Sequence, residues 1–184
     1  MSAYTIYNPS WSFVGLSNFI DVAENPVFRQ TLYNTFIFTF GSQILGLILG
    51  KFGALVLLRP FPGRKFVRAL VILPWAVPIA LATVAWQWMF DSLYSVINWT
   101  MIALGIITRS EAPNWLGNPD LAMISVIVVN AWRFFPFAIV IFMAGITAVP
   151  QDVLDAATVD GAGFWRRNYQ IIVPMILPIV AIGL

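Results

Sequence analysis

Long apolar runs separated by short polar stretches dominate the chain. A helix rises about 1.5 Å per residue and a bilayer core is about 30 Å thick, so roughly 20 apolar residues can cross it. Three runs reach this length and cover residues 35–58, 69–90 and 121–149. A fourth begins at Pro174 and reaches Leu184, which is too short to cross. The pattern predicts one all-α, multi-pass membrane domain over the whole chain, with its last span cut short.

Basic residues in the links between the runs predict the orientation of the spans. The link at 59–68, RPFPGRKFVR, holds four basic residues and no acid. Residues 1–34 hold one arginine and two acids, and residues 91–120 hold one arginine and three acids. Because Lys and Arg accumulate on the cytoplasmic side of membrane proteins, we expect 59–68 and, by the parity of crossings, 150–173 in the cytoplasm. The other two segments then lie outside.

The outer link contains an apolar segment that is too interrupted to span, SLYSVINWTMIALGII (92–107). We expect an interfacial helix in this segment, with Trp99 and Trp115 at the level of the lipid headgroups. In the preceding span, Pro74 and Pro78 each remove a helix hydrogen bond and predict a kink. Such a kink can serve a gate or be a fixed feature of shape.

Composition narrows the class of function. The 184 residues are 60% hydrophobic and 10% charged, with a net charge of +2, no cysteine and no histidine. Disulfides and thiolate metal sites are thereby excluded, and the commonest general base is missing. No cluster of Lys and Arg forms the polar basic face that nucleic acid requires. We therefore predict a chain that is not an enzyme, with no catalytic residue, metal site or cofactor of its own, surrounded by membrane lipid.

A glycine-rich stretch in the first span, GLILGKFG, superficially matches a phosphate-binding loop. That motif needs four residues between its glycines and Ser or Thr after its lysine. Here three residues separate Gly46 from Gly50, and Phe52 follows Lys51. The two glycines instead predict a close helix–helix contact of the small-xxx-small kind. Lys51 should snorkel, pair or line a wet cavity, and the sequence does not choose among these.

The third span carries an arginine within the motif NAWRFFPF (130–137). A charge inside a span is costly and marks a functional candidate, here Arg133. Asn130, Phe134 and Phe137 share one helix face. An amide and two rings at mid-membrane suit a hydroxylated solute. Alternatively, Arg133 binds a carbonyl or an acid structurally and the rings only pack, and the residues leave both interpretations open.

The polar interval at 150–173 predicts a helix, a break and a second helix. The first helix should run from Gln151 to about Val159 and stop at Gly161, a residue typical of helix C-termini. The second should begin with Asp160 as its N-cap and end near residue 173, where Pro174 opens the next span. Two short helices held between spans would act as a lever.

This interval either lies passively on lipid, with Arg166 and Arg167 on phosphates, or binds a protein. Three acids crowd its first half: Asp152, Asp155 and Asp160. An anionic membrane surface would repel them, which favours a protein partner. The small side chains of Ala156 and Ala157 would let the surface of that partner approach closely.

The spacing within DAATVDGAGFWRRNYQIIVPMILP (155–178) resembles the cytoplasmic signature of integral membrane permeases of ATP-binding-cassette (ABC) importers. That signature reads Glu-Ala-Ala, three residues, Gly, nine residues, then Ile-x-Leu-Pro. The matching positions here are Asp155, Ala156, Ala157, Asp160, Gly161, Ala162, Ile171, Val173, Pro174 and Pro178. Asp155 stands where the signature has Glu and Val173 where it has Leu.

Further stretches resemble the maltose-type sugar branch of these permeases: residues 13–19, 59–78 and 115–137. The resemblance covers nearly the whole chain and implies a helical bundle of the type I ABC importer kind. Since that branch has six core spans, we expect one span before Met1 and further span residues after Leu184. Lys51 is a departure from the usual small or aliphatic residue.

The resemblance also implies a function and partners. Residues 151–162 would form a coupling helix that docks in a groove of a cytoplasmic ATPase dimer, which would hold ATP and Mg. A second homologous permease and an extracytoplasmic solute-binding protein would complete an importer for a sugar or polyol in a bacterial or archaeal cytoplasmic membrane. The span holding residues 130–137 would contribute to the sugar path.

Two other classes of function stay open. One is an ion-coupled secondary transporter with Lys51 or Arg133 in its coupling route, although the predicted spans lack the carboxylates that usually serve this role. The other is a structural membrane subunit that anchors a cytoplasmic partner through residues 150–173.

Overall fold

The structure is a computed structural model that describes residues 15–183. All regular elements in that range are helical. The chain divides into two compact units, Met1–Gly41 and Ser42–Leu184. Residues 13 and 14 of the stretch 13–19, and Leu184 at the end of the fourth run, lie outside the described residues.

The first unit contains α1 (Ser17–Glu24) and the beginning of α2 (Pro26–Leu58). Asn25 separates the two helices, and its side-chain oxygen accepts a hydrogen bond of 2.8 Å from the amide of Val27. This contact satisfies one of the unpaired N–H groups at the start of α2. The guanidinium of Arg29 donates to the carbonyl of Ala23 at 2.8 Å and so ties the two helices together.

Within residues 15–183, two helices are long and apolar enough to cross a membrane, α2 with 33 residues and α6 (Pro119–Ala148) with 30. They contain the predicted first and third spans almost entirely. Asn118 begins α6 by accepting hydrogen bonds from the amides of Asp120 and Leu121, and Pro119 occupies the first turn, where a missing N–H costs nothing. Both helices therefore follow from the sequence pattern.

The predicted second span is broken rather than kinked. It consists of α3 (Arg64–Ala76) and α4 (Ile79–Met89), which meet at an angle of 95°. The break falls at Val77, whose extended ψ of 130° is the conformation that a following proline imposes. Pro74 lies inside α3 without ending it, so Pro78 alone marks the break. The pair counts as a third span only if both helices are taken together.

The outer link folds around a buried asparagine. The segment predicted to be interfacial forms α5 (Val96–Ala103), and its cap Ser95 accepts from the amide of Asn98. The Asn98 side chain donates to the carbonyl of Pro113 at 3.1 Å and accepts from the indole of Trp115 at 2.8 Å. Trp115 therefore uses its N–H inside the protein, whereas Trp99 is 70% exposed. A short 3₁₀ turn, η1 (Arg109–Glu111), precedes α6.

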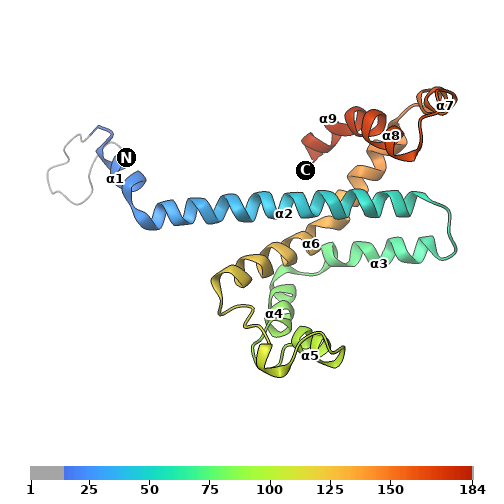
Figure 1. The fold of residues 1–184 in the computed structure, drawn as a ribbon. Helices are drawn as coiled ribbons and strands as arrows, with labels where there is room; N and C mark the ends of the chain where they lie inside the picture. The colour runs from blue at the N-terminus through green and yellow to red at the C-terminus, as the bar shows by residue number, and fades with distance from the viewer. Residues whose placement is uncertain (1–14, 184) are drawn as a thin grey trace. The chain divides into compact units, whose positions relative to one another are not determined.

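The C-terminal part contains α7 (Gln151–Val159), α8 (Phe164–Arg167), the π-helical turn η2 (Asn168–Ile172) and α9 (Val173–Gly183). Helical backbone continues from α8 through η2 into α9, because the residues at both junctions have αR dihedrals. Pro174 is the second residue of α9 and stands directly after this π-helical turn. In Figure 1, α6 leads from the outer link to α7, and α8 and α9 follow in orange and red.

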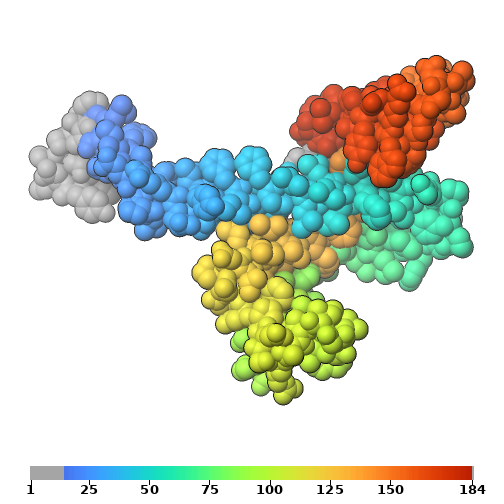
Figure 2. Space-filling model, viewed as in Figure 1, coloured from blue at the N-terminus to red at the C-terminus, as the bar shows by residue number. Residues whose placement is uncertain are grey.

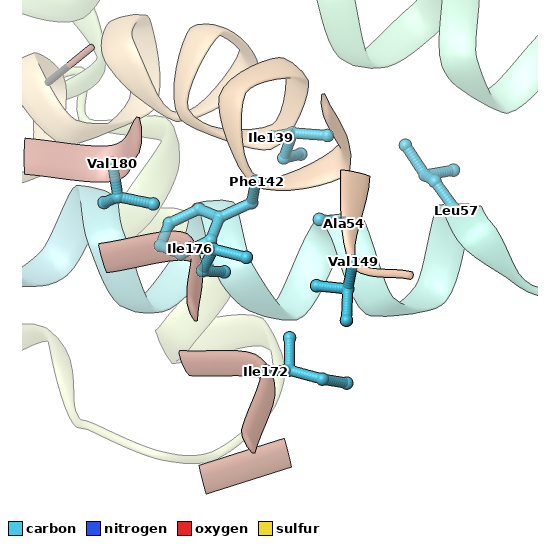
Figure 3. Close-up of a cluster of buried hydrophobic side chains, with 8 residues drawn as sticks. All are labelled: Ala54, Leu57, Ile139, Phe142, Val149, Ile172, Ile176 and Val180. Atoms are coloured by element: carbon cyan, nitrogen blue, oxygen red, sulfur yellow. The ribbon is translucent and has the colours of Figure 1, made fainter. Parts of the chain in front are cut away.

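The hydrophobic core of the second unit joins α2, α6, η2 and α9. Figure 3 shows its buried side chains: Ala54, Leu57, Ile139, Phe142, Val149, Ile172, Ile176 and Val180. Gly145 lets α9 approach α6, because a Cβ at this position would lie 3.2 Å from the Cβ of Ile176. Burying such side chains stabilises by about 1.5–3 kcal/mol each in water, but in lipid the close packing itself supplies most of the gain.

The glycine pattern in α2 makes a close contact with α6, as the sequence predicts, but with a shifted set of residues. A Cβ on Gly50 would lie 2.5 Å from the Cβ of Ala138, and a Cβ on Gly53 would collide with Ile139. A Cβ on Gly46 would meet no atom within 4 Å. The contact therefore uses Gly50 and Gly53 instead of the predicted Gly46 and Gly50.

Candidate functional site

The elbow after α7 is a Schellman motif, the commonest way in which a glycine ends a helix. The amide of Gly161 donates to the carbonyl of Thr158 at 3.1 Å, and the amide of Ala162 donates to the carbonyl of Ala157 at 2.9 Å. Gly161 adopts φ +74°, the left-handed conformation that residues with a Cβ avoid. The break predicted at Gly161 thus has a defined geometry that depends on this residue.

One face of α7 is exposed, and we call it the α7 outer face. Its members recur at the i, i+3, i+4, i+7 spacing of a single helix face: Asp152, Asp155, Ala156 and Val159. Val159 is 87% exposed, an unusual position for a valine. The carboxylate of Asp155 accepts a hydrogen bond of 2.9 Å from the side-chain amide of Gln151. Figure 2 shows α7 and α8, in orange, uncovered by other parts of the chain on the side drawn.

Ala157 does not belong to the α7 outer face. It is 5% exposed and lies on the same side of α7 as Leu154, which packs against the core. The expectation that both alanines let a partner approach closely is therefore wrong for Ala157 and stays a prediction for Ala156.

Asp160 does not begin the second helix. It is the C-cap of α7, with its amide bonded to the carbonyl of Ala156 at 3.0 Å. Since the Schellman turn needs Gly161 and Ala162 for its two hydrogen bonds, the next helix starts only at Phe164, with Gly163 as its N-cap. The elbow brings Asp155–Ala162 together, whereas Ile171 lies in η2 and Pro174 in α9.

The predicted polar site on α6 has the aromatic face that the spacing indicates. The rings of Phe134 and Phe137 meet edge to face with centroids 5.6 Å apart, and Trp75 of α3 stacks on Phe137 at 6.4 Å. Asn130 and Arg133 are half-buried. The Nε of Arg133 is buried and finds no hydrogen-bond acceptor among the described residues.

Lys51 faces the segment that follows the elbow. Its Nζ lies 4.1 Å from the ring centroid of Tyr169, a cation–π contact between α2 and η2. It also lines a cavity of about 670 Å³, which agrees with one of the three roles that the sequence left open. The sequence did not predict this contact, because nothing local links Tyr169 to a residue so far back in the chain.

The outer end of α4 carries a carboxylate in a tight turn. Asp91 accepts hydrogen bonds of 2.8 Å from the backbone amides of Tyr94 and Leu93. These two bonds hold the pKa of Asp91 below its usual range, and the bond from Tyr94 has the larger effect. Asp91 and Tyr94 also line a cavity of about 560 Å³ with Trp88. The described residues contain no group of three or more His, Cys, Asp or Glu that could hold a metal ion.

The chain is similar in sequence to known transport proteins. The chain is 35% identical over 176 residues to the trehalose/maltose transport system permease protein of Thermococcus litoralis, covering 96% of this chain and 58% of that relative. It is 32% identical over 175 residues to the sn-glycerol-3-phosphate transport system permease protein of Yersinia pestis, covering 92% of this chain and 56% of the relative. The chain thus spans somewhat more than half the length of these curated relatives.

The fold also matches a solved structure. A chain in the crystal structure of a bacterial ABC transporter involved in the import of the acidic polysaccharide alginate superposes with a TM-score of 0.78 at 22% identity. The match covers 96% of this chain and 60% of that one. A family model described as "Binding-protein-dependent transport system inner membrane component" matches residues 43–184. This chain belongs to that family of inner membrane transport components, and its helical bundle is of the ABC importer permease kind.

Proposed function

We propose that the chain is part of the membrane permease of an ATP-driven ABC importer for a sugar or a related polyol. The observation that carries this proposal is the elbow, in which a short helix with a small, acidic outer face is ended by a Schellman motif at Gly161. Such a helix, fixed to α6 at one end and to α8 at the other, can transmit movement from a cytoplasmic ATPase to the spans. Hydrolysis would occur on that partner and not on this chain.

The α7 outer face suits a protein groove better than a lipid surface. Asp152 and Asp155 would be repelled by anionic headgroups, whereas Ala156 beside them leaves room for a partner backbone to approach. The exposed Val159 adds apolar area that would be covered on docking. Asp155 is one methylene shorter than glutamate, so its carboxylate reaches less far, and its bond to Gln151 holds it close to α7.

The solute path would run along α6. The relatives carry names for the transport of trehalose and maltose and of sn-glycerol-3-phosphate, all solutes rich in hydroxyl groups. Asn130 and the half-buried guanidinium of Arg133 would hydrogen-bond such groups, and Phe134 and Phe137 offer rings to the apolar faces of a sugar. A second permease and an extracytoplasmic solute-binding protein complete the proposed assembly.

The proposed mechanism needs only that ATP binds one conformational state of the transporter more tightly than the other. ATP would close the ATPase dimer, the docked α7 would move with it, and the spans would change from inward-facing to outward-facing. Hydrolysis of ATP would return the spans to the inward-facing state. A nucleotide shifts this equilibrium only by the difference of its affinities for the two states, so a stiff α7 elbow is required to pass that difference to the membrane.

The experiment is solute uptake by the complete transporter reconstituted in vesicles, with the solute-binding protein outside and ATP inside. We expect uptake to require both and to survive an ionophore that removes the ion gradient. Ala156→Trp should abolish uptake and the stimulation of ATPase activity, while Ala156→Ser should retain both. Uptake that persists without ATP and stops with the ionophore would instead establish an ion-coupled transporter, and a membrane subunit that serves only as an anchor would give no uptake in any arm.

A further inference from the structure

A cavity of about 670 Å³ lies between the C-terminal end of α2 and the segment α8–η2. Its walls come from residues 48–61 on one side and 164–169 on the other. Both sides belong to the second compact unit. The cavity is separate from the α7 outer face and from the polar face of α6, so neither part of the proposed function accounts for it.

Two cations line this cavity, and no acid is among its lining residues. Lys51 lies over the ring of Tyr169 at 4.1 Å, and the Arg59 guanidinium carbon lies 5.8 Å from the ring centroid of Phe164. Arg59 directly follows the end of α2, whereas Lys51 lies about 10 Å further along the helix at 1.5 Å per residue. With residues 59–68 in the cytoplasm, as the sequence predicts, Arg59 would stand at the membrane face and Lys51 deeper in the membrane, as a headgroup entering from that face would require.

A buried amide also lines the cavity without any partner. Asn168 is 2% exposed, and neither Oδ1 nor Nδ2 has a hydrogen-bond partner in the part of the chain that the structure describes. A buried polar group without a hydrogen bond destabilises the fold, so its persistence needs a reason. Asn168 begins the π-helical turn η2, a type of turn that is frequent at functional sites. A ligand with acceptor oxygens and a hydroxyl would satisfy both atoms of this amide.

We propose that this cavity binds the phosphate-bearing headgroup of an anionic phospholipid, and that phosphatidylglycerol fits it. The phosphate would lie between Lys51 and Arg59, and the headgroup hydroxyls and ester oxygens would meet the amide of Asn168. Trp165 and Tyr169 stack on each other at 5.9 Å beside the cavity, and such rings favour the headgroup level of a membrane. Basic cavities of this kind between membrane helices suit anionic lipids.

Three features favour a lipid over a protein segment. The cations stand at two depths along one membrane helix, the walls are otherwise apolar or aromatic, and the buried amide offers both a donor and an acceptor. A protein segment would need an acid inside the membrane to match the charges, which is costly. Free phosphate would neutralise the cations but would leave the apolar walls unfilled.

The test measures lipid preference at Trp165, which lines the cavity. The complete permease is placed in lipid nanodiscs, and its fluorescence is quenched with brominated phosphatidylglycerol or with brominated phosphatidylcholine at equal mole fraction. Subtracting the signal of the Trp165→Phe variant isolates this residue from the other tryptophans. We expect phosphatidylglycerol to quench Trp165 at a much lower mole fraction than phosphatidylcholine, and millimolar inorganic phosphate to leave that preference intact.

Substitutions of the residues that line the cavity test whether the preference for phosphatidylglycerol arises there. Each cation near a membrane surface contributes about fivefold to anionic lipid affinity, so Lys51→Gln with Arg59→Gln should reduce the preference about 25-fold. Lys65→Gln is the matched control, because Lys65 is exposed in the same link but does not line the cavity. Asn168→Leu should weaken the preference without lowering the melting temperature, since it removes an unsatisfied amide.

Four results would overturn the proposal. They are equal quenching by both lipids, full preference in the Lys51 and Arg59 double variant, displacement of the lipid by inorganic phosphate, and no quenching of Trp165 by either lipid. The last result would mean that protein covers the cavity. If the double variant fails to fold, Asn168→Leu alone decides, because an unchanged preference in that variant contradicts the assigned role of the amide. None of these readouts depends on transport.

Discussion

Gly161 adopts φ +74°, and its amide donates to the carbonyl of Thr158 at 3.1 Å. Any residue with a Cβ in this left-handed conformation is strained by roughly 1–2 kcal/mol. A Cβ at this position would meet no other atom within 4 Å. The cost of Gly161→Ala therefore comes from backbone conformation alone, and it is expected to be about 1 kcal/mol or slightly more.

The expected effects form an ordered series. Asparagine tolerates the left-handed region better than alanine does, so Gly161→Asn should cost less than Gly161→Ala. Proline cannot adopt a positive φ and has no amide to donate to Thr158, so Gly161→Pro should cost at least about 3 kcal/mol at the elbow. A cost of 1–2 kcal/mol shifts a local equilibrium by roughly 5–30-fold. The elbow should thus loosen step by step while the spans stay folded.

Two measurements on the reconstituted transporter check this series. Hydrogen exchange of the amides of Gly161 and Ala162 reports the order of the elbow, except where proline has no amide. ATP-driven uptake per ATP hydrolysed reports coupling. Gly163→Ala is the matched control, because Gly163 has φ −65° and a Cβ there would meet no atom within 4 Å. This control should leave exchange and coupling unchanged.

The reasoning would be refuted by equal effects of Gly161→Ala and Gly163→Ala, since only the first residue is in the left-handed region. It would also be refuted if Gly161→Pro coupled uptake to ATP as well as the unchanged protein does. Loss of the whole protein from the membrane in the proline variant leaves the alanine and asparagine variants to decide, because their cost is too small to unfold the spans.

Three further predictions follow from contacts elsewhere in the chain. Gly50→Ala should destabilise the bundle by about 1–3 kcal/mol because its Cβ would lie 2.5 Å from that of Ala138; thermal unfolding should show partial rescue by Ala138→Gly and no loss in the Gly46→Ala control. Because hydrogen bonding lowers the pKa of Asp91 from 3.8, its turn should be fully stabilised above that pH and loosen as the pH falls below it; Asp91→Asn should remove this pH dependence of amide exchange. Arg133→Gln should reduce uptake by about 10–100-fold if its half-buried guanidinium binds solute, with assembly unchanged by gel filtration.

The elements with strong local signals were predictable from the sequence. The ends of α7 at Gln151 and Val159 agree with the predicted bounds, because glycine at a helix end and acids in a first turn act over a few residues. The third span also agrees with α6, since Asn118 and Pro119 are start signals. The fold class was also predictable, because the length of an apolar run decides whether a helix can cross a membrane.

The failures of the sequence prediction have physical causes. Asp160 looked like an N-cap because aspartate favours that position, but the Schellman turn uses the next two residues before another helix can start. The sequence predicted a kink at Pro74 and Pro78 and could not give its size, since the 95° angle between α3 and α4 depends on what each helix packs against. Tertiary contacts thus decide what local preference leaves open.

The direction of a side chain is harder still to predict, and the candidate sites depend on it. Ala156 and Ala157 are neighbours of the same type, yet one is exposed and the other faces the core. Asn168 is polar in a stretch rich in polar residues, yet it is 2% exposed in the fold. Periodicity gives the set of residues on one face, but which face turns inward depends on the neighbouring helix.

The segment from α7 to η2 therefore presents two surfaces in opposite chemical environments. The α7 outer face carries acids and is expected to meet a protein, whereas the other side, from Phe164 to Tyr169, meets the cations of α2 around a cavity. The two surfaces are separated by the elbow at Gly161, whose dihedral angle only glycine adopts without strain. A change in that angle would alter both surfaces together, so variants of the elbow should change lipid preference at Trp165 as well as coupling, whereas Ala156→Trp should change coupling alone.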